Sequence, residues 1–123
     1  YALPVAYLGV DCSSPYLALA LYGGGVRASV LERVGRDHAK RITPALDELF
    51  RQAALTPRDL LGVSVGVGPG SYTGLRVGVA TARGIARALD LPLRGESTLL
   101  AMAAAALSPA EPRAVVALDA RRG

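Results

Sequence analysis

The stretch that decides the fold covers residues 61–89 and reads LGVSVGVGPGSYTGLRVGVATARGIARAL. Its first part, residues 61–67, is a short apolar run of the kind found in strands buried inside a sheet. A loop rich in glycine follows at residues 68–73, and residues 74–89 then show small and apolar side chains at helical spacing. A buried strand that leads through a tight loop into a helix is a building unit of α/β sheets.

The helix predicted over residues 74–89 carries a row of its smallest side chains at four-residue spacing, namely Gly74, Gly78, Ala82 and Ala86. Glycine inside a helix costs up to about 1 kcal/mol relative to alanine, so a close approach of another backbone is expected to compensate. Either the sheet of the same domain or a helix of a partner can supply that approach, and the spacing leaves both open. Arg76, Arg83 and Arg87 form the opposite, polar face.

The residues before this stretch predict three strands, at residues 5–10, 16–22 and 26–34. The first is a continuous apolar run, which predicts a central strand buried on both faces. Three glycines at residues 23–25 predict a hairpin turn, and the alternation after them predicts a half-exposed edge strand. Asp37 is then expected to cap a helix that runs to about residue 55, with Pro44 in its first turn.

The residues after this stretch predict a strand at 91–94, a third helix from a Ser97 cap to residue 107, a linker at 108–112 and a strand at 113–119. Strands that first form an antiparallel meander and then alternate with helices predict one mixed, five-stranded sheet with helices packed on it. The fold class is therefore α/β.

Composition predicts a cytoplasmic globular protein without a membrane segment. The apolar run at residues 99–107 is too short to cross a bilayer, and no basic region precedes an apolar start as in a signal peptide. Cys12 is the only cysteine, which indicates a reducing compartment. The net charge of +4 is spread along the chain without interleaved aromatic residues, which disfavours direct nucleic-acid binding.

The end of the first predicted strand is the one place that suggests ligand chemistry. Asp11 follows the strand, and Ser13 and Ser14 come directly after it. A carboxylate at the carboxyl end of a buried strand is a common position for magnesium-nucleotide chemistry, and equally a common cap of a turn. The loop at residues 66–74 fits neither G-x-G-x-x-G nor the Walker A pattern.

Other catalytic patterns are missing from the sequence. His38 is the only histidine, and no C-x-x-C or H-x-x-x-H pair accompanies it, so no metal site is predicted. Ser71 lacks the G-x-S-x-G surroundings of a nucleophilic serine, and Cys12 lacks a basic neighbour that would activate its thiol. We therefore predict no catalytic residues and no cofactor, and we expect His38 to be a structural or interface residue.

Four segments together resemble one protein family. Residues 66–84 resemble the GPGS[FY]TG[LV]R[IV]G signature of the TsaB (YeaZ) family. Residues 8–13 resemble its I-D-T-S strand and turn, with Cys12 where threonine is usual. Residues 37–46 resemble its H-S-x-x-L-x-P helix start, with Ala39 in place of serine. Residues 118–123 resemble its D-A-R segment, and the four segments follow the order of the family.

This resemblance implies the actin/Hsp70-like (ASKHA) fold, which has two similar lobes related to ribonuclease H. Residues 1–108 would form the N-terminal lobe, and residues 109–123 a linker and the first strand of a truncated second lobe. Asp11, Ser13 and Ser14 would then be a vestigial phosphate loop.

The resemblance also implies a function, that of a non-catalytic partner. Such proteins bind and support the TsaD subunit, which transfers a threonylcarbamoyl group to adenosine 37 of tRNA, together with the TsaE ATPase. Alone they form homodimers through the helices of this lobe, and they meet tRNA only through the complex. The expected partner interface comprises His38, Leu46, Leu49, Phe50, Gly74, Arg76, Gly78, Ala82, Arg83, Ala86 and Arg87.

Two alternatives remain open at this point. One is an ASKHA protein that binds nucleotide by itself, with Asp11 and the Ser13–Ser14 turn near the phosphates. The other is a glycoprotease-like metallopeptidase, which the missing metal ligands disfavour. Titration with magnesium and ATP addresses the first, and zinc analysis addresses the second.

Overall fold

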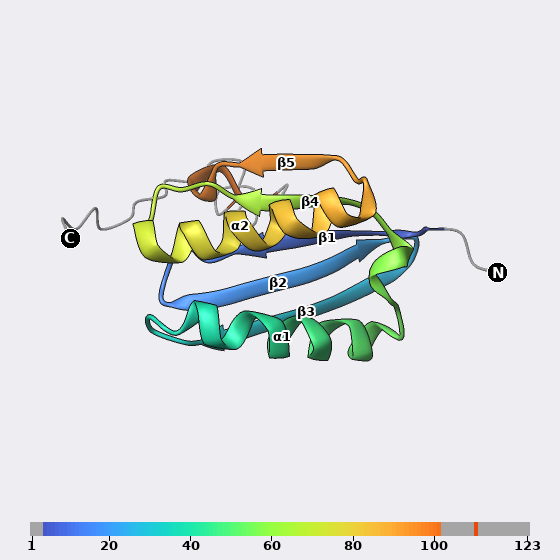
Figure 1. The fold of residues 1–123 in the computed structure, drawn as a ribbon, viewed down its shortest axis with the longest axis horizontal. Helices are drawn as coiled ribbons and strands as arrows, with labels where there is room; N and C mark the ends of the chain where they lie inside the picture. Colours follow the sequence, from blue (N-terminus) through green and yellow to red (C-terminus); the bar gives the residue numbers. More distant parts are fainter. Residues whose placement is uncertain (1–3, 102–109, 111–123) are drawn as a thin grey trace.

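The computed structural model describes residues 4–101 and residue 110. Its elements are, in chain order, β1 (Ala6–Asp11), β2 (Tyr16–Gly23), β3 (Val26–Arg33), α1 (His38–Ala53), the short 3-10 helix η1 (Pro57–Asp59), β4 (Leu60–Gly66), α2 (Tyr72–Leu89) and β5 (Leu93–Glu96). Figure 1 shows the strands side by side, with the two long helices running along them on the near side of the sheet.

The five strands form one mixed sheet in the order β3-β2-β1-β4-β5. β1, β2 and β3 are joined as an antiparallel meander, whereas β4 runs parallel to β1 and β5 runs parallel to β4. The predicted fold class, sheet type and meander are confirmed. β1 lies at the centre because both its antiparallel neighbour β2 and its parallel neighbour β4 pair with it along its length.

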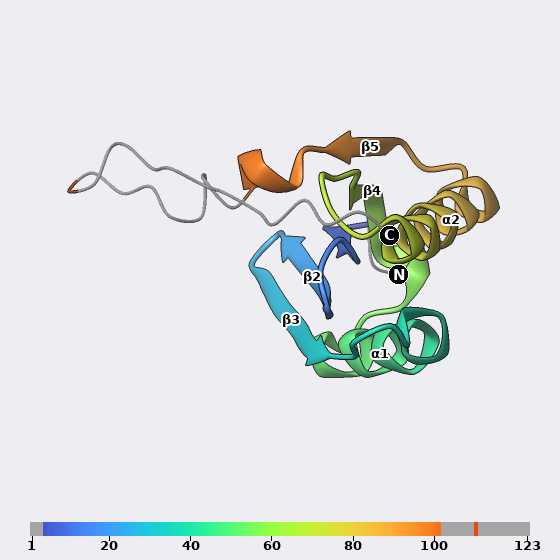
Figure 2. The ribbon, with the colours of Figure 1, turned by 90° about the vertical axis from the view of Figure 1, so that its left-hand side faces the viewer.

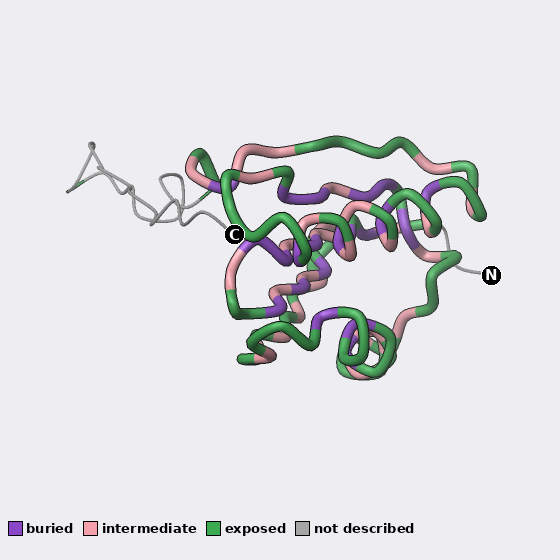
Figure 3. Tube along the Cα trace, turned by 60° about the vertical axis from the view of Figure 1, so that its left-hand side comes forward, coloured by how far each residue is buried: buried purple, intermediate pink, exposed green. Residues whose placement is uncertain are grey.

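Both helices cover the same face of the sheet, α1 over β2 and β3 and α2 over β4 and β1 (Figure 2). The core lies between the sheet and the two helices, where leucines and valines of the strands meet the inward faces of the helices (Figure 3). On α1 the inward residues Ile42, Ala45 and Leu49 recur at helical spacing and are buried. On α2 the inward row is the small-residue row of the sequence, and all of its members are buried.

β1 is central as expected, but the prediction that both of its faces are buried is wrong for the described part of the chain. Tyr7 is 43% exposed on the face without long helices, and its ring stacks on that of Tyr22 at 5.7 Å between centroids. An apolar run does not distinguish a strand covered on one side from a strand covered on both. Tyrosine suits the open face because its ring is apolar and its hydroxyl reaches water.

Differences from the predicted elements include the cap of α1 and the starts of α2 and β5. Asp37 precedes α1 but its side chain makes no capping hydrogen bond, and Pro44 lies in the second turn rather than the first. Because Pro44 has no N–H, one carbonyl of the preceding turn lacks its helical hydrogen bond. Pro44 is exposed, so water can bond to that carbonyl instead. α2 begins two residues early because the Ser71 hydroxyl accepts the Gly74 N–H at 3.3 Å. β5 begins later than predicted because Leu91 N–H still bonds the Ala86 carbonyl at the end of α2.

The start of the third helix is confirmed, since the Ser97 hydroxyl accepts the Leu100 N–H at 3.2 Å. The remainder of that helix to residue 107, the linker at 108–112, the strand at 113–119 and the division of the chain at residue 108 lie outside the described residues, apart from residue 110. In the part that the structure describes, no helix is both long enough and apolar enough to span a membrane.

Candidate functional site

The carboxyl ends of β1 and β4 lie next to each other, because the two strands are parallel and Val10 is paired with Val65. This brings Asp11 beside Gly66, where ligands of open α/β sheets usually bind. One Asp11 carboxylate oxygen accepts the N–H of Ser13 at 2.8 Å and its hydroxyl at 2.5 Å. The other oxygen accepts the hydroxyl of Thr98 at 3.3 Å, so the carboxylate joins the turn after β1 to the start of the third helix.

Glycines let the loop after β4 pack tightly against this turn. A Cβ added at Gly66 would overlap the Asp11 carboxylate, and one added at Gly70 would overlap the Ser13 carbonyl oxygen. The same carbonyl accepts the Ser71 N–H at 2.8 Å. The loop at residues 66–71 therefore packs tightly against the turn that follows Asp11. Its glycines allow this close packing and do not form either of the two phosphate-binding patterns.

His38 connects the first turn of α1 to the turn between β1 and β2. Its Nε2–H donates to the carbonyl oxygens of Ser14, at 2.9 Å, and Tyr16, at 3.2 Å. Both partners are carbonyl oxygens, which only accept, so Nε2 carries the proton. The ring is buried, with 3% of the residue exposed, and the structural role expected for His38 is confirmed. Its place in a partner interface stays a prediction.

Cys12 follows Asp11 and is fully buried beneath α2. Burial, and then the negative charge of Asp11, raise the pKa of the Cys12 thiol to about 12. The thiol is therefore neutral at physiological pH, which agrees with the absence of an activating basic neighbour. Within the described ranges, no group of three or more His, Cys, Asp or Glu residues could hold a metal ion.

We expect the Cys12 thiol of the folded protein to resist a disulfide reagent at about pH 8 and to react fully in denaturant. Because the pKa of the folded state lies above its ordinary value of 9.0, the folded state keeps a proton that the unfolded state releases at higher pH. The free energy of unfolding should thus fall as the pH rises from about 9 toward 12. Cys12→Ala should remove this part of the fall, and rapid labelling of the folded wild type would contradict the prediction.

The small-residue row of α2 lies against the sheet of its own lobe. A Cβ added at Gly74 would overlap the Cys12 carbonyl oxygen, and one at Gly78 would lie 3.2 Å from the Cys12 sulfur. Ala82 and Ala86 are buried in the same interior, as is Leu49 of α1. The spacing was compatible with a close approach by the sheet or by a helix of a partner, and in the structure the sheet side of the lobe makes it. A role of these five residues in a partner interface stays a prediction, and it would be indirect, through the position of α1 and α2.

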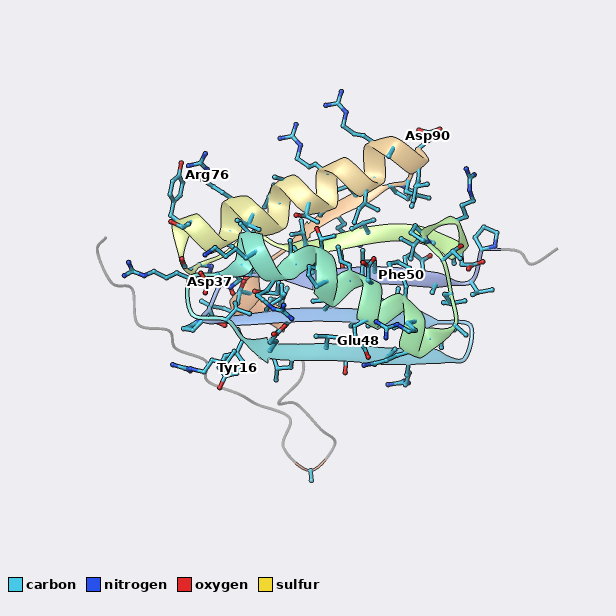
Figure 4. The ribbon with its side chains drawn as sticks, turned by 60° about the horizontal axis from the view of Figure 1, so that its bottom comes forward. Tyr16, Asp37, Glu48, Phe50, Arg76 and Asp90 are labelled. Atoms are coloured by element: carbon cyan, nitrogen blue, oxygen red, sulfur yellow. The ribbon has the colours of Figure 1, made fainter. Side chains whose placement is uncertain are left out.

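The remaining residues of the expected interface are at least partly accessible to solvent. Leu46 and Phe50 of α1 are half-buried, and Arg76, Arg83 and Arg87 of α2 are exposed. Arg76 extends away from the sheet at the start of α2, where its guanidinium lies 5.5 Å from the centroid of the Tyr72 ring (Figure 4). The three arginines are therefore open to a partner, whereas Leu46 and Phe50 are open only in part, because they also pack against the core.

A groove of about 410 Å³ runs along the outer side of α2, lined by Val67, Tyr72, Leu75, Arg76, Val79, Ala80 and Arg83. Two of its large hydrophobic residues are strongly exposed, Val67 at 53% and Tyr72 at 72%. Sequence reasoning found the two arginines but missed the apolar members. Tyr72, Leu75 and Val79 are spaced as a second stripe beside the buried row, a signal that was available, whereas the approach of Val67 from β4 depends on the fold.

The charges of the two helices differ. On α1, Arg51 pairs with Glu48 at 2.7 Å, and Arg41 pairs with Glu32 of β3 at 3.0 Å. α2 contains three arginines and no acidic residue. None of these arginines forms an ion pair within the part of the chain that the structure describes. The outer side of α2 is therefore a cationic face with an apolar groove.

The sequence of this chain is similar to known proteins. A family model described as TsaD, tRNA N6-adenosine threonylcarbamoyltransferase, matches residues 19–123. The tRNA threonylcarbamoyladenosine biosynthesis protein TsaB of Escherichia coli is 33% identical over 94% of this chain and 51% of its own length. The protein of the same name from Haemophilus influenzae is 40% identical over 93% of this chain and 49% of its own length.

A solved structure gives the same result for the fold. YeaZ from Pseudomonas aeruginosa superposes with a TM-score of 0.74 at 30% identity, over 77% of this chain and 45% of that chain. The chain spans about half the length of the curated relatives it matches. Sequence and structure therefore agree, and the chain belongs to the TsaB (YeaZ) family.

Proposed function

We propose that this chain is a partner-binding lobe in the threonylcarbamoyladenosine modification of tRNA, and that it supports a TsaD-like catalytic subunit without catalysing the transfer itself. The relatives of the chain carry the name of that pathway, and the family model that matches it describes the transferase. The observation that carries the proposal is the cationic, grooved face of α2, which offers a partner apolar surface and three arginines that form no ion pair with the described residues.

The absence of a catalytic role is supported by what the polar groups at the strand ends do. The Asp11 carboxylate accepts hydrogen bonds from Ser13 and Thr98, and the Nε2–H of His38 is shared between two carbonyl oxygens. A general base or nucleophile needs a free polar atom that faces its substrate. Both carboxylate oxygens of Asp11 and the Nε2–H of His38 instead hold elements of the lobe together.

The interface that we propose is formed by both helices, which lie side by side on one face of the sheet (Figure 2). Leu46 and Phe50 contribute apolar surface from α1, and Arg76, Arg83 and Arg87 contribute charge from α2. The buried members of the expected interface would hold these helices in place on the sheet. A TsaE-like ATPase and tRNA would join through the complex, and a homodimer would use the same helices in the absence of the partner.

Reconstitution tests this proposal directly. The full-length protein and the TsaD-like subunit of the same organism are purified separately and mixed, and size-exclusion chromatography with light scattering reports the complex. We expect a stable heteromeric complex. We also expect threonylcarbamoyladenosine, measured by mass spectrometry of digested tRNA, to form only when the TsaD-like subunit is present and to increase when this protein is added.

Two results would contradict it. Formation of the modified nucleoside by this protein alone would show that it catalyses the transfer, and absence of both a complex and a stimulation would remove the partner role. Zinc analysis of the purified protein separates the proposal from the metallopeptidase alternative, because a peptidase of that kind would retain about one zinc ion per active site.

A further inference from the structure

We propose that the corner of the lobe where β3 leads into α1 binds the phosphate backbone of the tRNA substrate. This basic corner comprises Tyr16 at the start of β2, Arg33 at the end of β3, Arg36 in the loop that follows, and Lys40 in the first turn of α1. Figure 4 shows Tyr16 and the neighbouring Asp37 at the same end of the lobe. This inference rests on the proposed function for the identity of the RNA, and it adds a direct contact of this lobe with tRNA inside the complex. No residue of the basic corner lines the groove of α2.

Cationic side chains gather at the basic corner without an equal number of acidic ones. Residues 32–41 contain four cationic side chains and two acidic ones. Glu32 pairs with Arg41 at 3.0 Å, and this ion pair cancels one charge of each sign. The three cations of the corner are exposed and form no ion pair with the described residues. Asp37 is the other acid of the segment, so an excess of positive charge remains, and such a surface attracts a polyanion.

An exposed aromatic ring lies among these cations. Tyr16 pairs with Arg33 across the two strands, and the Arg33 guanidinium lies 5.6 Å from the centroid of the tyrosine ring. Tyr16 is 39% exposed, so part of its ring is open to a ligand. Surfaces that bind single-stranded nucleic acid combine cations, which contact phosphates, with aromatic rings, on which bases stack. Spacing along the chain does not reveal this combination, because only the pairing of β2 with β3 brings Tyr16 to the cations.

Hydrogen bonds hold the basic corner in one arrangement. The N–H groups of Val34 and Gly35 both donate to the Pro15 carbonyl oxygen, each at 2.9 Å. The Nε2–H of His38 donates to two further carbonyl oxygens of the same segment, residues 14–16. The turn before β2, the loop after β3 and the start of α1 are therefore joined to one another. Backbone that is already fixed in this way lowers the entropy cost of ordering a binding surface.

Equilibrium binding of tRNA to the complex of the full-length protein with the TsaD-like subunit tests the proposal. The double variant Arg33→Gln, Arg36→Gln removes two cations of the corner. Arg27→Gln, Arg58→Gln is the matched control, because both residues are exposed and precede or begin strands at the opposite end of the lobe. Unmodified tRNA with a fluorescent label is titrated at about 0.1 M salt. We expect the corner variant to raise the dissociation constant for tRNA by about tenfold and the control to raise it by less than about threefold.

The salt dependence of tRNA binding provides an independent measurement. Each phosphate that a cation neutralises contributes about 0.7–0.9 to the slope of log K against log salt concentration. The slope of the corner variant should therefore be smaller than that of the wild type by about 1–2, whereas the control should keep the slope of the wild type. Tyr16→Leu should weaken tRNA binding without changing the slope, because it removes a ring and no charge. Circular dichroism confirms that the variants fold, and size-exclusion chromatography shows whether they still bind the TsaD-like subunit.

The outcomes separate this inference from the proposed function. If the corner variant and the control bind tRNA equally well and both bind the TsaD-like subunit, the basic corner does not contact tRNA and the partner role stands. If the folded corner variant no longer binds the TsaD-like subunit, the corner belongs to a protein interface and the inference is wrong.

The same titration is made with this protein alone at about 0.05 M salt, where phosphate contacts are stronger. If the wild type does not bind the TsaD-like subunit, the partner role fails, and the difference between the corner variant and the control in this titration still decides whether the corner contacts RNA. If the wild type binds no tRNA in either titration, the inference is wrong.

Discussion

Gly74→Ala should lower the free energy of unfolding by about 2–3 kcal/mol, although alanine is the better helix former. The added Cβ would overlap the Cys12 carbonyl oxygen and lie 3.4 Å from Cε1 of His38. A backbone carbonyl cannot rotate away as a flexible side chain can, so α2 or the turn after β1 must move. Because the same turn holds the hydrogen bonds of Asp11 and His38, the displacement disturbs both.

Gly84→Ala on the same helix is the matched control. A Cβ at Gly84 meets no atom within 4 Å, so the substitution should stabilise the lobe by about 0.5–1 kcal/mol through helix propensity alone. Urea unfolding followed by circular dichroism measures both variants. Equal effects of the two substitutions would contradict the prediction, since they would mean that helix propensity rather than the contact with Cys12 governs the row.

Asp11→Ala is the second substitution with a large expected effect, a loss of about 2–4 kcal/mol of stability. The carboxylate accepts hydrogen bonds from the Ser13 N–H, the Ser13 hydroxyl and the Thr98 hydroxyl. Hydrogen bonds to a charged acceptor stabilise more than neutral ones, and their loss leaves the partly buried donors without a partner. The start of the third helix should loosen as well, which amide hydrogen exchange at residues 98–101 would report.

The control for Asp11→Ala is Ser14→Ala, which removes a hydroxyl that accepts the Tyr16 N–H at 3.1 Å in an exposed turn. Its effect should stay below about 1 kcal/mol. The pair also tests the stand-alone nucleotide alternative, because isothermal titration of the wild type with magnesium and ATP should give no binding if Asp11 is structural. Binding that Asp11→Ala abolishes without loss of stability would instead assign Asp11 to a nucleotide site.

The small-residue row shows how far spacing alone can carry a prediction. It indicated a close approach at Gly74 and Gly78, and Cys12 makes that approach, with its backbone carbonyl at Gly74 and its side chain at Gly78. It did not indicate which surface makes the approach, because a helix presents the same row to a sheet or to a partner. For this reason a bulky residue at Gly78 would damage the lobe before it reported on any interface, and exposed Arg76, Arg83 and Ala80 are the informative positions.

By itself the sequence determined the elements of this protein and their order. Apolar runs, glycine turns and helical spacing predicted the five strands, the mixed sheet and the two long helices, because these features depend on neighbours along the chain. Spacing along α2 also separated a small-residue face from the face of Arg76, Arg83 and Arg87.

Only the tertiary structure decided what those faces do. It brought Thr98 to Asp11, across 87 residues of sequence, and Val67 to the side of α2. It also placed the tyrosines of β1 and β2 on the face without long helices. Such contacts depend on which strands pair and on which face each helix covers, and local periodicity carries no information about either.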